Sequence, residues 1–372
     1  MKAQGIDVIN MSVGEPDFMT PDHIKEAGKK AIDDNYSKYS PVPGYMDLRE
    51  AISEKLAKEN NLSYSAKEII VGTGGKQGVC NAILALVNPG DEVIIPTPYW
   101  VSYPQMVKLA GGTPVTLRTP LESDFKLTPE QLEAAITPKT KMLIICSPSN
   151  PTGSVYTQDE LNALAEVVKK HDDMYVLSDE IYEHINYVGF KASIAAAPDM
   201  KDRTIICNGV SKAYAMTGWR LGWVAAPEWI IKGMNKLQGQ YTSGTNDVAQ
   251  RAALAAYKGD QQCVEDMRVA FQRRRDLIVK LAKEIPGLEV NVPQGAFYLF
   301  PHCKKLFGKS YGDYTINTST DFAMYLLQEA HVATVAGDAF GEPDGFRMSY
   351  ATSDDNIREA LRRIKEACEK LK

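Results

Sequence analysis

The chain has 372 residues, of which 44% are hydrophobic and 24% are charged, as is ordinary for a soluble globular protein. Its formal net charge of −5 suggests no nucleic-acid or phospholipid partner, and no run approaches the ~20 apolar residues of a membrane span. The start of the chain has no apolar stretch of signal-peptide type. Cys263 and Cys303, the nearest pair of its six cysteines, are 40 positions apart, which excludes a metal knuckle or redox pair. We therefore expect a cytoplasmic protein of two domains, without a metal.

From about residue 20 to 270, short apolar runs alternate with helical patterns, which predicts an α/β fold with a mostly parallel sheet. Some helix starts are well marked. Thr20 and Thr128 each place a capping hydroxyl before a proline at the first helical position. Thr157 and Glu160 form a capping box.

Five apolar strands in this region are each followed by unusual polar residues. The strands are Glu68–Val71, Glu92–Ile95, Met142–Cys146, Tyr175–Leu177 and Thr204–Cys207. In open α/β sheets, ligands bind just beyond the carboxyl ends of the strands. The five loops are therefore predicted to converge on one rim.

After about residue 260 the pattern changes. Residues 267–281 predict one long helix, a plausible connector between domains. Residues 288–350 contain short strands and loops, and residues 354–372 form an amphipathic, charged helix.

Two segments suggest a ligand that carries a phosphate and a carbonyl. Gly74 and Gly75 open a helix after a strand, where the backbone can approach a phosphate and free N–H groups face it; a plain tight turn is the alternative. Lys212 precedes Arg220 by eight positions. The amine can form a Schiff base and the guanidinium can clamp a phosphate, whereas the alternative is a surface lysine before a Gly-Trp turn.

Polar and aromatic residues at other strand ends could serve the same ligand. Asp179 could keep a pyridine nitrogen protonated, or could cap a helix. Tyr182 and Asn150 could bind a phenolic oxygen, although Asn150–Gly153 also reads as a turn. Trp100 could stack on an aromatic ring or pack in the core.

These motifs, in this order, resemble class I aminotransferases, which belong to the fold-type I family of pyridoxal-phosphate enzymes. The resemblance covers nearly the whole chain. It is closest to the bacterial aspartate/prephenate branch, through Gly14–Phe18, Tyr99–Pro104 and Ser178–His184. It implies an α/β fold of fold-type I. The large domain, 17–272, would hold a mostly parallel seven-stranded sheet between helices, and 1–16 with 273–372 would form a smaller α+β domain.

The resemblance implies pyridoxal 5′-phosphate as the cofactor and Lys212 as both its Schiff-base residue and the catalytic acid and base. Other residues would bind the phosphate, the ring and its substituents. They are Gly74, Gly75, Lys76, Ser211 and Arg220, with Asp179, Asn150, Tyr182 and Trp100 at the ring. In the family, the Asn150–Pro151 bond is expected to be cis.

Substrate residues follow from the same resemblance. Arg347 would grip the α-carboxylate, although an arginine there could also form a surface salt bridge. Lys76 would contact the distal carboxylate, and Gly44 would lie in the substrate-side loop, with Trp100 and Asn150 also at the substrate. Tyr39 resembles a tyrosine that reaches the phosphate of the neighbouring subunit, which implies a homodimer with shared sites; core packing is the alternative for Tyr39.

The implied reaction is a ping-pong transfer from aspartate to 2-oxoglutarate, with prephenate or aromatic amino acids as additional or alternative substrates. A carbon–sulfur lyase or decarboxylase on the same scaffold is the alternative enzyme. A non-catalytic regulator would need a DNA-binding segment, for which this acidic chain offers no room. Relatives carry an N-terminal arm before the position of Lys2–Gly5, so without it we expect weaker dimer contacts and substrate closure.

Overall fold

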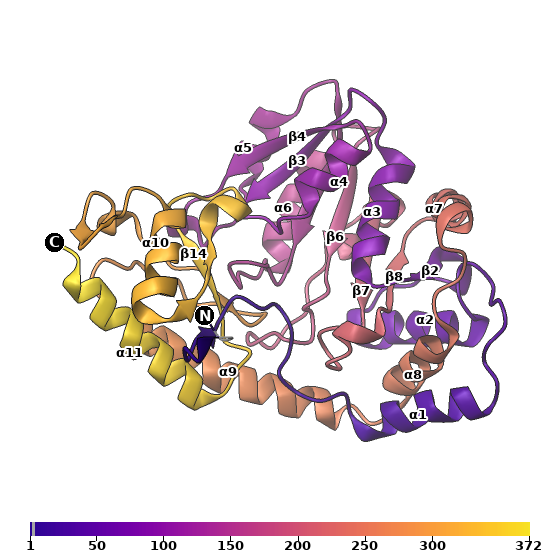
Figure 1. The fold of residues 1–372 in the computed structure, drawn as a ribbon. Helices are drawn as coiled ribbons and strands as arrows, with labels where there is room; N and C mark the ends of the chain where they lie inside the picture. The colour runs from indigo at the N-terminus through magenta and orange to yellow at the C-terminus, as the bar shows by residue number, and fades with distance from the viewer. Residues whose placement is uncertain (2–3) are drawn as a thin grey trace.

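The computed structural model describes residue 1 and residues 4–372. Its largest element is a seven-stranded sheet with helices packed on both sides (Figure 1). Its strand order is β2-β8-β7-β6-β5-β3-β4, and only β8 runs antiparallel to its neighbours. The strands are β2 (Ile69–Gly72), β3 (Glu92–Thr97), β4 (Thr113–Arg118), β5 (Thr140–Cys146), β6 (Tyr175–Asp179), β7 (Thr204–Gly209) and β8 (Gly222–Ala225). The mostly parallel seven-stranded sheet predicted from the sequence is confirmed.

Helices cover both faces of this sheet because the strands are apolar on both sides. Along β5, Met142 and Ile144 pack in one core with three helices, and Leu143 and Ile145 pack in another. The first face is covered by α3 (Gly75–Leu86), α4 (Tyr103–Leu109) and α7 (Glu228–Tyr241). The opposite face is covered by α2 (Met46–Asn60), α5 (Pro129–Ala135), α6 (Gln158–Val168) and α8 (Asp247–Lys258), and α1 (Asp22–Asp33) packs on α8.

The long helix predicted over residues 267–281 is present as the 21-residue α9 (Gln262–Ala282), which leads from these helices to a second group of elements (Figure 1). This group contains the three-stranded sheet β13-β14-β9 and the parallel pair β1-β12. Its strands are β1 (Ile9–Asn10), β9 (Tyr298–Leu299), β12 (Val332–Ala333), β13 (Val335–Ala336) and β14 (Phe346–Ser349), and its helices are α10 (Ser319–Tyr325) and α11 (Asp354–Lys370). A short hairpin joins β10 (Ser310–Tyr311) to β11 (Tyr314–Thr315). Ile9 and Met11 share a hydrophobic core with residues of α9 and α11.

Two of the three predicted helix caps are present. The hydroxyls of Thr128 and Thr157 accept N–H groups at the starts of α5 and α6. The prediction for Thr20 was wrong: α1 begins without a side-chain cap, and the Thr20 hydroxyl donates instead to the carbonyl of Ala215 at 2.7 Å. The hydroxyl oxygen accepts the indole N–H of Trp219 at 3.2 Å in place of a helix N–H, so both hydrogen bonds of this hydroxyl go to distant segments.

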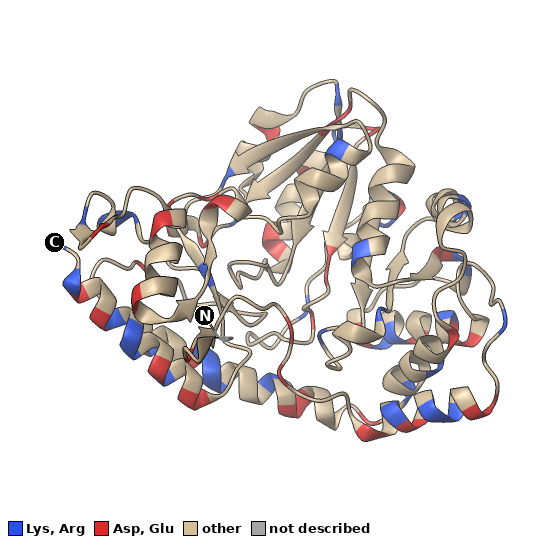
Figure 2. Ribbon diagram, in the orientation of Figure 1, with Lys and Arg blue, Asp and Glu red and all other residues tan. Residues whose placement is uncertain are grey.

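Charges of both signs alternate along the exposed helices α1, α9 and α11 (Figure 2). In α11, Arg362 pairs with Glu359 and Glu366 at helical spacing. Within residues 1 and 4–372, no helix combines the length and the apolar character needed to cross a membrane.

Candidate active site

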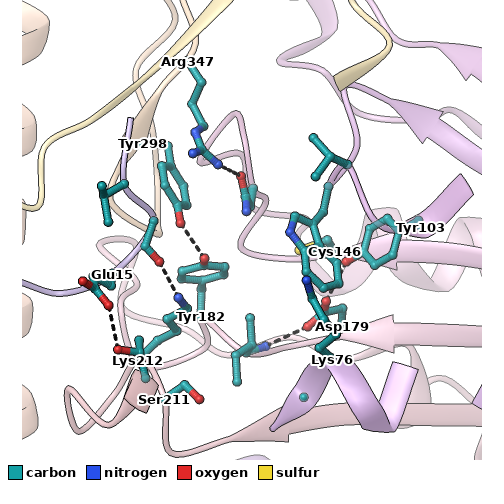
Figure 3. Close-up of a pocket in the computed structure, with 18 of the residues that line it drawn as sticks. Glu15, Lys76, Tyr103, Cys146, Asp179, Tyr182, Ser211, Lys212, Tyr298 and Arg347 are labelled. Carbon is teal, nitrogen blue, oxygen red and sulfur yellow. Dashed lines mark hydrogen bonds between the residues drawn. The ribbon is translucent and has the colours of Figure 1, made fainter. Parts of the chain in front are cut away.

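The loops that follow five parallel strands open on one pocket of about 480 Å³ (Figure 3). Each loop contributes lining residues, as predicted from the positions of the polar motifs. They are Gly75 and Lys76 after β2, Trp100 after β3, Asn150 after β5, Ile181 and Tyr182 after β6, and Ser211 and Lys212 after β7. The C-terminal part of the chain closes the other side with Tyr298, Phe340 and Arg347.

Lys212 points its amine into the pocket, where Nζ donates to the carbonyl of Gly14 at 2.5 Å (Figure 3). Burial lowers the pKa of Lys212 to about 8, although the nearby carboxylate of Glu15 opposes that shift. Thr217 holds this carboxylate through a 2.9 Å hydrogen bond. The neutral, nucleophilic form of this amine is therefore far more populated near neutral pH than that of an exposed lysine.

The glycine turn and Arg220 form a cradle at the N-terminus of α3. Gly74 has a φ of +83°, and a Cβ there would lie 2.5 Å from an Nη atom of Arg220. A Cβ on Gly222 would lie 2.2 Å from the backbone nitrogen of Gly75, so the start of β8 approaches the start of α3 as closely as their backbones allow. The first N–H groups of a helix have no intrahelical acceptor, and here they adjoin Ser211 and Arg220. This end of the pocket suits a phosphate.

Asp179, the last residue of β6, lies buried at the base of the pocket. Its Oδ2 accepts the hydroxyl of Tyr103 at 2.6 Å and its Oδ1 accepts the N–H of Ile181 at 3.3 Å. Burial raises the pKa of this carboxyl, and the hydrogen bond from Tyr103 opposes the rise. The local turn contact is therefore present, as for a cap, but no helix follows, and the carboxyl faces the pocket.

Arg347 is buried beside Asn150, so the alternative of a surface salt bridge is wrong. Its Nη1 donates to Asn150 Oδ1 at 2.9 Å and its Nη2 donates to the carbonyl of Ser12 at 2.7 Å. Its Nε is buried without a hydrogen-bond partner among the described residues. Leaving such a donor unpaired is costly, and a ligand carboxylate would satisfy it. The Asn150–Pro151 bond is cis, as predicted.

The hydroxyls of Tyr182 and Tyr298 meet at 2.7 Å on the wall opposite Asp179 (Figure 3). Across the pocket, Trp100 is partly buried and packs edge-on against Tyr103 with ring centroids 5.3 Å apart. The ammonium of Lys76 lies 5.0 Å from the Trp100 ring centroid, a cation–π contact that holds it at the pocket mouth.

Three predicted site residues do not line this pocket in the single chain: Gly74 adjoins it next to Gly75, whereas Tyr39 and Gly44 belong to other parts of the surface and core. Tyr39 is 98% exposed, so the alternative of core packing is wrong, and it lines a separate surface hollow with Gly244 and Asn246. Gly44 has a φ of +93° and packs against Val71 and Gln250. A contact of Tyr39 or Gly44 with a ligand would need another subunit, or a movement of the loop.

The pocket fits the cofactor that the resemblance implies. Its amine, its anion cradle and its buried carboxyl stand around one cavity, where a pyridine aldehyde phosphate presents a carbonyl, a phosphate and a ring nitrogen. The unpaired Nε of Arg347 leaves a donor for a substrate carboxylate on the far side.

Some pocket residues were missed by the sequence reasoning. Tyr103 and Glu15 lie within motifs that carried the resemblance, yet neither was given a role there. Cys146, at the end of β5, also lines the pocket, where burial and the nearby Asp179 carboxylate raise the pKa of its thiol. Tyr298 had a weaker signal, an aromatic residue in a short strand that follows a glycine-containing loop.

Comparison with known proteins agrees with this geometry. Residues 6–364 match the family described as aminotransferase class I and II. The chain is 52% identical over 371 residues to an aspartate/prephenate aminotransferase of Cereibacter sphaeroides, an alignment covering 99% of this chain and 93% of that protein. The solved aspartate aminotransferase of Rhizobium meliloti superposes with a TM-score of 0.97 at 47% identity, covering 100% of this chain and 94% of that one. The Thermus thermophilus aspartate aminotransferase with maleate gives 0.92 at 42% identity, covering 98% and 93%.

Proposed function

Since this chain belongs to the class I and II aminotransferases, we propose that it transfers the amino group of aspartate to 2-oxoglutarate. The observation that carries the proposal is one pocket in which a lysine of lowered pKa faces an arginine with an unpaired Nε. The relatives of Cereibacter sphaeroides and Rhizobium meliloti support aspartate as the donor. The name of the first also favours prephenate as an additional acceptor.

Residues at the phosphate end and around the ring would hold pyridoxal phosphate. Ser211, Arg220 and the N–H groups of Gly75 and Lys76, beside Gly74, would bind the phosphate. Asp179 would accept a hydrogen bond from the ring nitrogen and so keep it protonated, while Asn150 and Tyr182 would bind the phenolic oxygen and Trp100 would cover the ring. When bound, the cofactor supplies an electron sink for the pair left by the broken Cα–H bond.

The chain itself positions the amino acid and moves its proton. Arg347 binds the α-carboxylate, and Lys76 lies where an ammonium can meet a distal carboxylate. Lys212 Nζ then accepts the proton from Cα, because its lowered pKa leaves the amine able to act as a base near neutral pH. The Tyr103 hydroxyl, which donates to Asp179 Oδ2, favours the charged carboxylate that would pair with the ring nitrogen.

We further propose a cytoplasmic homodimer in which residues 17–272 hold the cofactor and residues 1–16 with 273–372 form the smaller domain. Large apolar side chains stand exposed at the pocket, at the Tyr39 hollow and at two further hollows that share Arg220 with the pocket, and a second copy would cover them. They are Met19, Tyr39, Val101, Leu109 and Tyr241. In such a dimer, Tyr39 would reach the partner's site, and Gly44 would lie in the substrate-side loop.

The proposal is tested with purified protein and a panel of amino donors with 2-oxoglutarate. The protein should absorb visible light, bleach on borohydride treatment and carry the label on Lys212. Lys212→Ala should lose nearly all turnover, whereas Lys126→Ala, which removes an ion pair with Glu160 outside the pocket, should retain it. A Lys212→Ala protein with near-normal turnover would refute the mechanism, and a better rate with non-dicarboxylic donors would refute aspartate as the substrate.

A further inference from the structure

Tyr298 stands between the two ends of the pocket, beside Arg347 and above Tyr182 (Figure 3). Its position follows from the pairing of β9 with β14. Tyr298 lies opposite Ser349 in this antiparallel pair, and Arg347 is two residues from Ser349 on the same face. Tyr298 and Arg347 are therefore diagonal cross-strand neighbours, close enough for an aromatic ring and a long side chain to touch.

The hydroxyl of Tyr298 is directed at Tyr182. The two oxygens are 2.7 Å apart, and among the described residues the Tyr298 hydroxyl has no other hydrogen-bond partner. Gly14 leaves the space, because a Cβ there would lie 2.7 Å from the Tyr298 oxygen. Burial raises the pKa of both phenols, so both keep their protons at neutral pH.

One proton on each hydroxyl fixes the direction of this contact when a ligand is bound. A tyrosine hydroxyl donates one hydrogen and accepts others. If Tyr182 donates to the phenolic oxygen of the cofactor, its hydrogen is used, and the bond at 2.7 Å must then be donated by Tyr298. A hydroxyl that accepts a hydrogen bond becomes a stronger donor in turn.

The ring of Tyr298 supports Arg347. The guanidinium carbon lies 4.6 Å from the Tyr298 ring centroid and 5.0 Å from that of Phe340. Together with the bonds to Asn150 and Ser12, these rings hold the guanidinium in one orientation, with Nε left free.

We infer that Tyr298 is a positioning residue with two separable roles: its hydroxyl strengthens Tyr182 as a donor to the cofactor, and its ring orients Arg347 for the substrate carboxylate. The inference rests on the proposed function. It also links the substrate end of the pocket to the cofactor end, because one side chain touches both residues.

Two variants separate the roles. Tyr298→Phe removes only the hydroxyl. The phenolic oxygen then receives a weaker hydrogen bond, which disfavours the deprotonated form of the lysine-bound cofactor. The pKa read from its visible absorbance should therefore rise by about 0.4–1 unit. Affinity for succinate, a non-reacting dicarboxylate, should stay within about twofold. Tyr298→Leu also removes the ring and should weaken succinate binding about 2- to 30-fold.

Tyr325→Phe is the matched control, since its buried hydroxyl donates to the carbonyl of Ala367, outside the pocket. It should leave the absorbance titration and succinate affinity unchanged. Tyr298→Phe should cause no further rise of the spectroscopic pKa in a Tyr182→Phe background, because its effect acts through Tyr182.

An unchanged pKa in folded Tyr298→Phe, or a full shift that persists without the Tyr182 hydroxyl, would overturn the role of the hydroxyl. Equal losses of succinate affinity in the Phe and Leu variants would overturn the role of the ring, and the Phe variant decides the first question even if the Leu variant fails to fold. A wild-type protein without a visible band would refute the proposed function itself, and the inference with it. If the wild-type band titrates, but the variants give one of the contrary results for the hydroxyl or the ring, the inference about Tyr298 is refuted and the proposed function stands.

Discussion

Replacing Arg347 by lysine tests the substrate end of the pocket while keeping its charge. The guanidinium now donates to Asn150 at 2.9 Å and to Ser12 at 2.7 Å, and it keeps Nε for a ligand. A lysine ammonium is a point charge that lacks the planar fork, so it cannot make these contacts and bind a carboxylate bidentately at once. Either a protein acceptor or the substrate must lose a donor.

The expected loss follows from one hydrogen bond to a charged group. Such a bond contributes about 1.5–3 kcal/mol, which corresponds to roughly 10- to 150-fold in kcat/KM. The loss should appear for every amino acid tested, because all share the α-carboxylate. The visible absorbance of the bound cofactor should remain, since Arg347 lies on the far side of the pocket from the anion cradle.

The assay is steady-state kcat/KM for aspartate and alanine, with succinate affinity as the equilibrium measure. Arg203→Lys is the control. Arg203 lies just before β7 and away from the pocket, and its guanidinium also donates to backbone carbonyls, including that of His171 at 3.0 Å. This variant should change kcat/KM less than twofold. A folded Arg347→Lys protein with less than a threefold loss would show that this arginine does not bind the substrate carboxylate.

Three further predictions concern other residues. Lys76→Ala should lower kcat/KM for aspartate by about 10- to 150-fold and for alanine by less than threefold, because only aspartate has a second carboxylate; equal losses would assign Lys76 to the phosphate or the fold. If Tyr39 acts across a dimer, mixing impaired Tyr39→Phe and Lys212→Ala subunits should restore activity, since one site of each heterodimer is intact; no recovery despite proven exchange would contradict shared sites. Burial beside Glu183 raises the pKa of Glu180 to about 7 from 4.5, so the folded state keeps a proton that the unfolded state loses, and stability falls as pH rises through that window. In wild type, the free energy of unfolding measured in urea should fall by on the order of 1–3 kcal/mol between pH 5 and pH 8, and Glu180→Gln should remove this fall; an unchanged fall would locate the titration elsewhere.

The sheet and the rim of the pocket could be predicted because both depend on short, contiguous stretches of the sequence. Each strand is a short apolar run, and the polar residues that follow it, such as Asp179 after β6, need no distant information to reach the rim. The strands that were not named beforehand have weaker patterns. β4 is an edge strand with several exposed positions, and β8 is a short segment that begins with glycine.

Contacts between distant segments could not be predicted, since they depend on register and on competition among partners. Thr20 has the sequence of a helix cap, yet its hydroxyl donates to Ala215, 195 positions away, and accepts the indole N–H of Trp219. Nothing local at Tyr103 indicates that it will donate to Asp179 across 76 positions. A motif therefore indicates which residues face the pocket, but not which hydroxyl will form its hydrogen bonds with a distant segment.

Two hydroxyls to which the motifs gave no role, those of Tyr103 and Tyr298, line the pocket beside residues that the motifs revealed. Tyr103 supports Asp179, and Tyr298 supports Tyr182. Each donates to, or exchanges a hydrogen bond with, the group that would set the charge of a bound ring, so each can adjust that charge without touching it. Substitutions that remove either supporting hydroxyl should therefore alter the titration of the site before they abolish its activity.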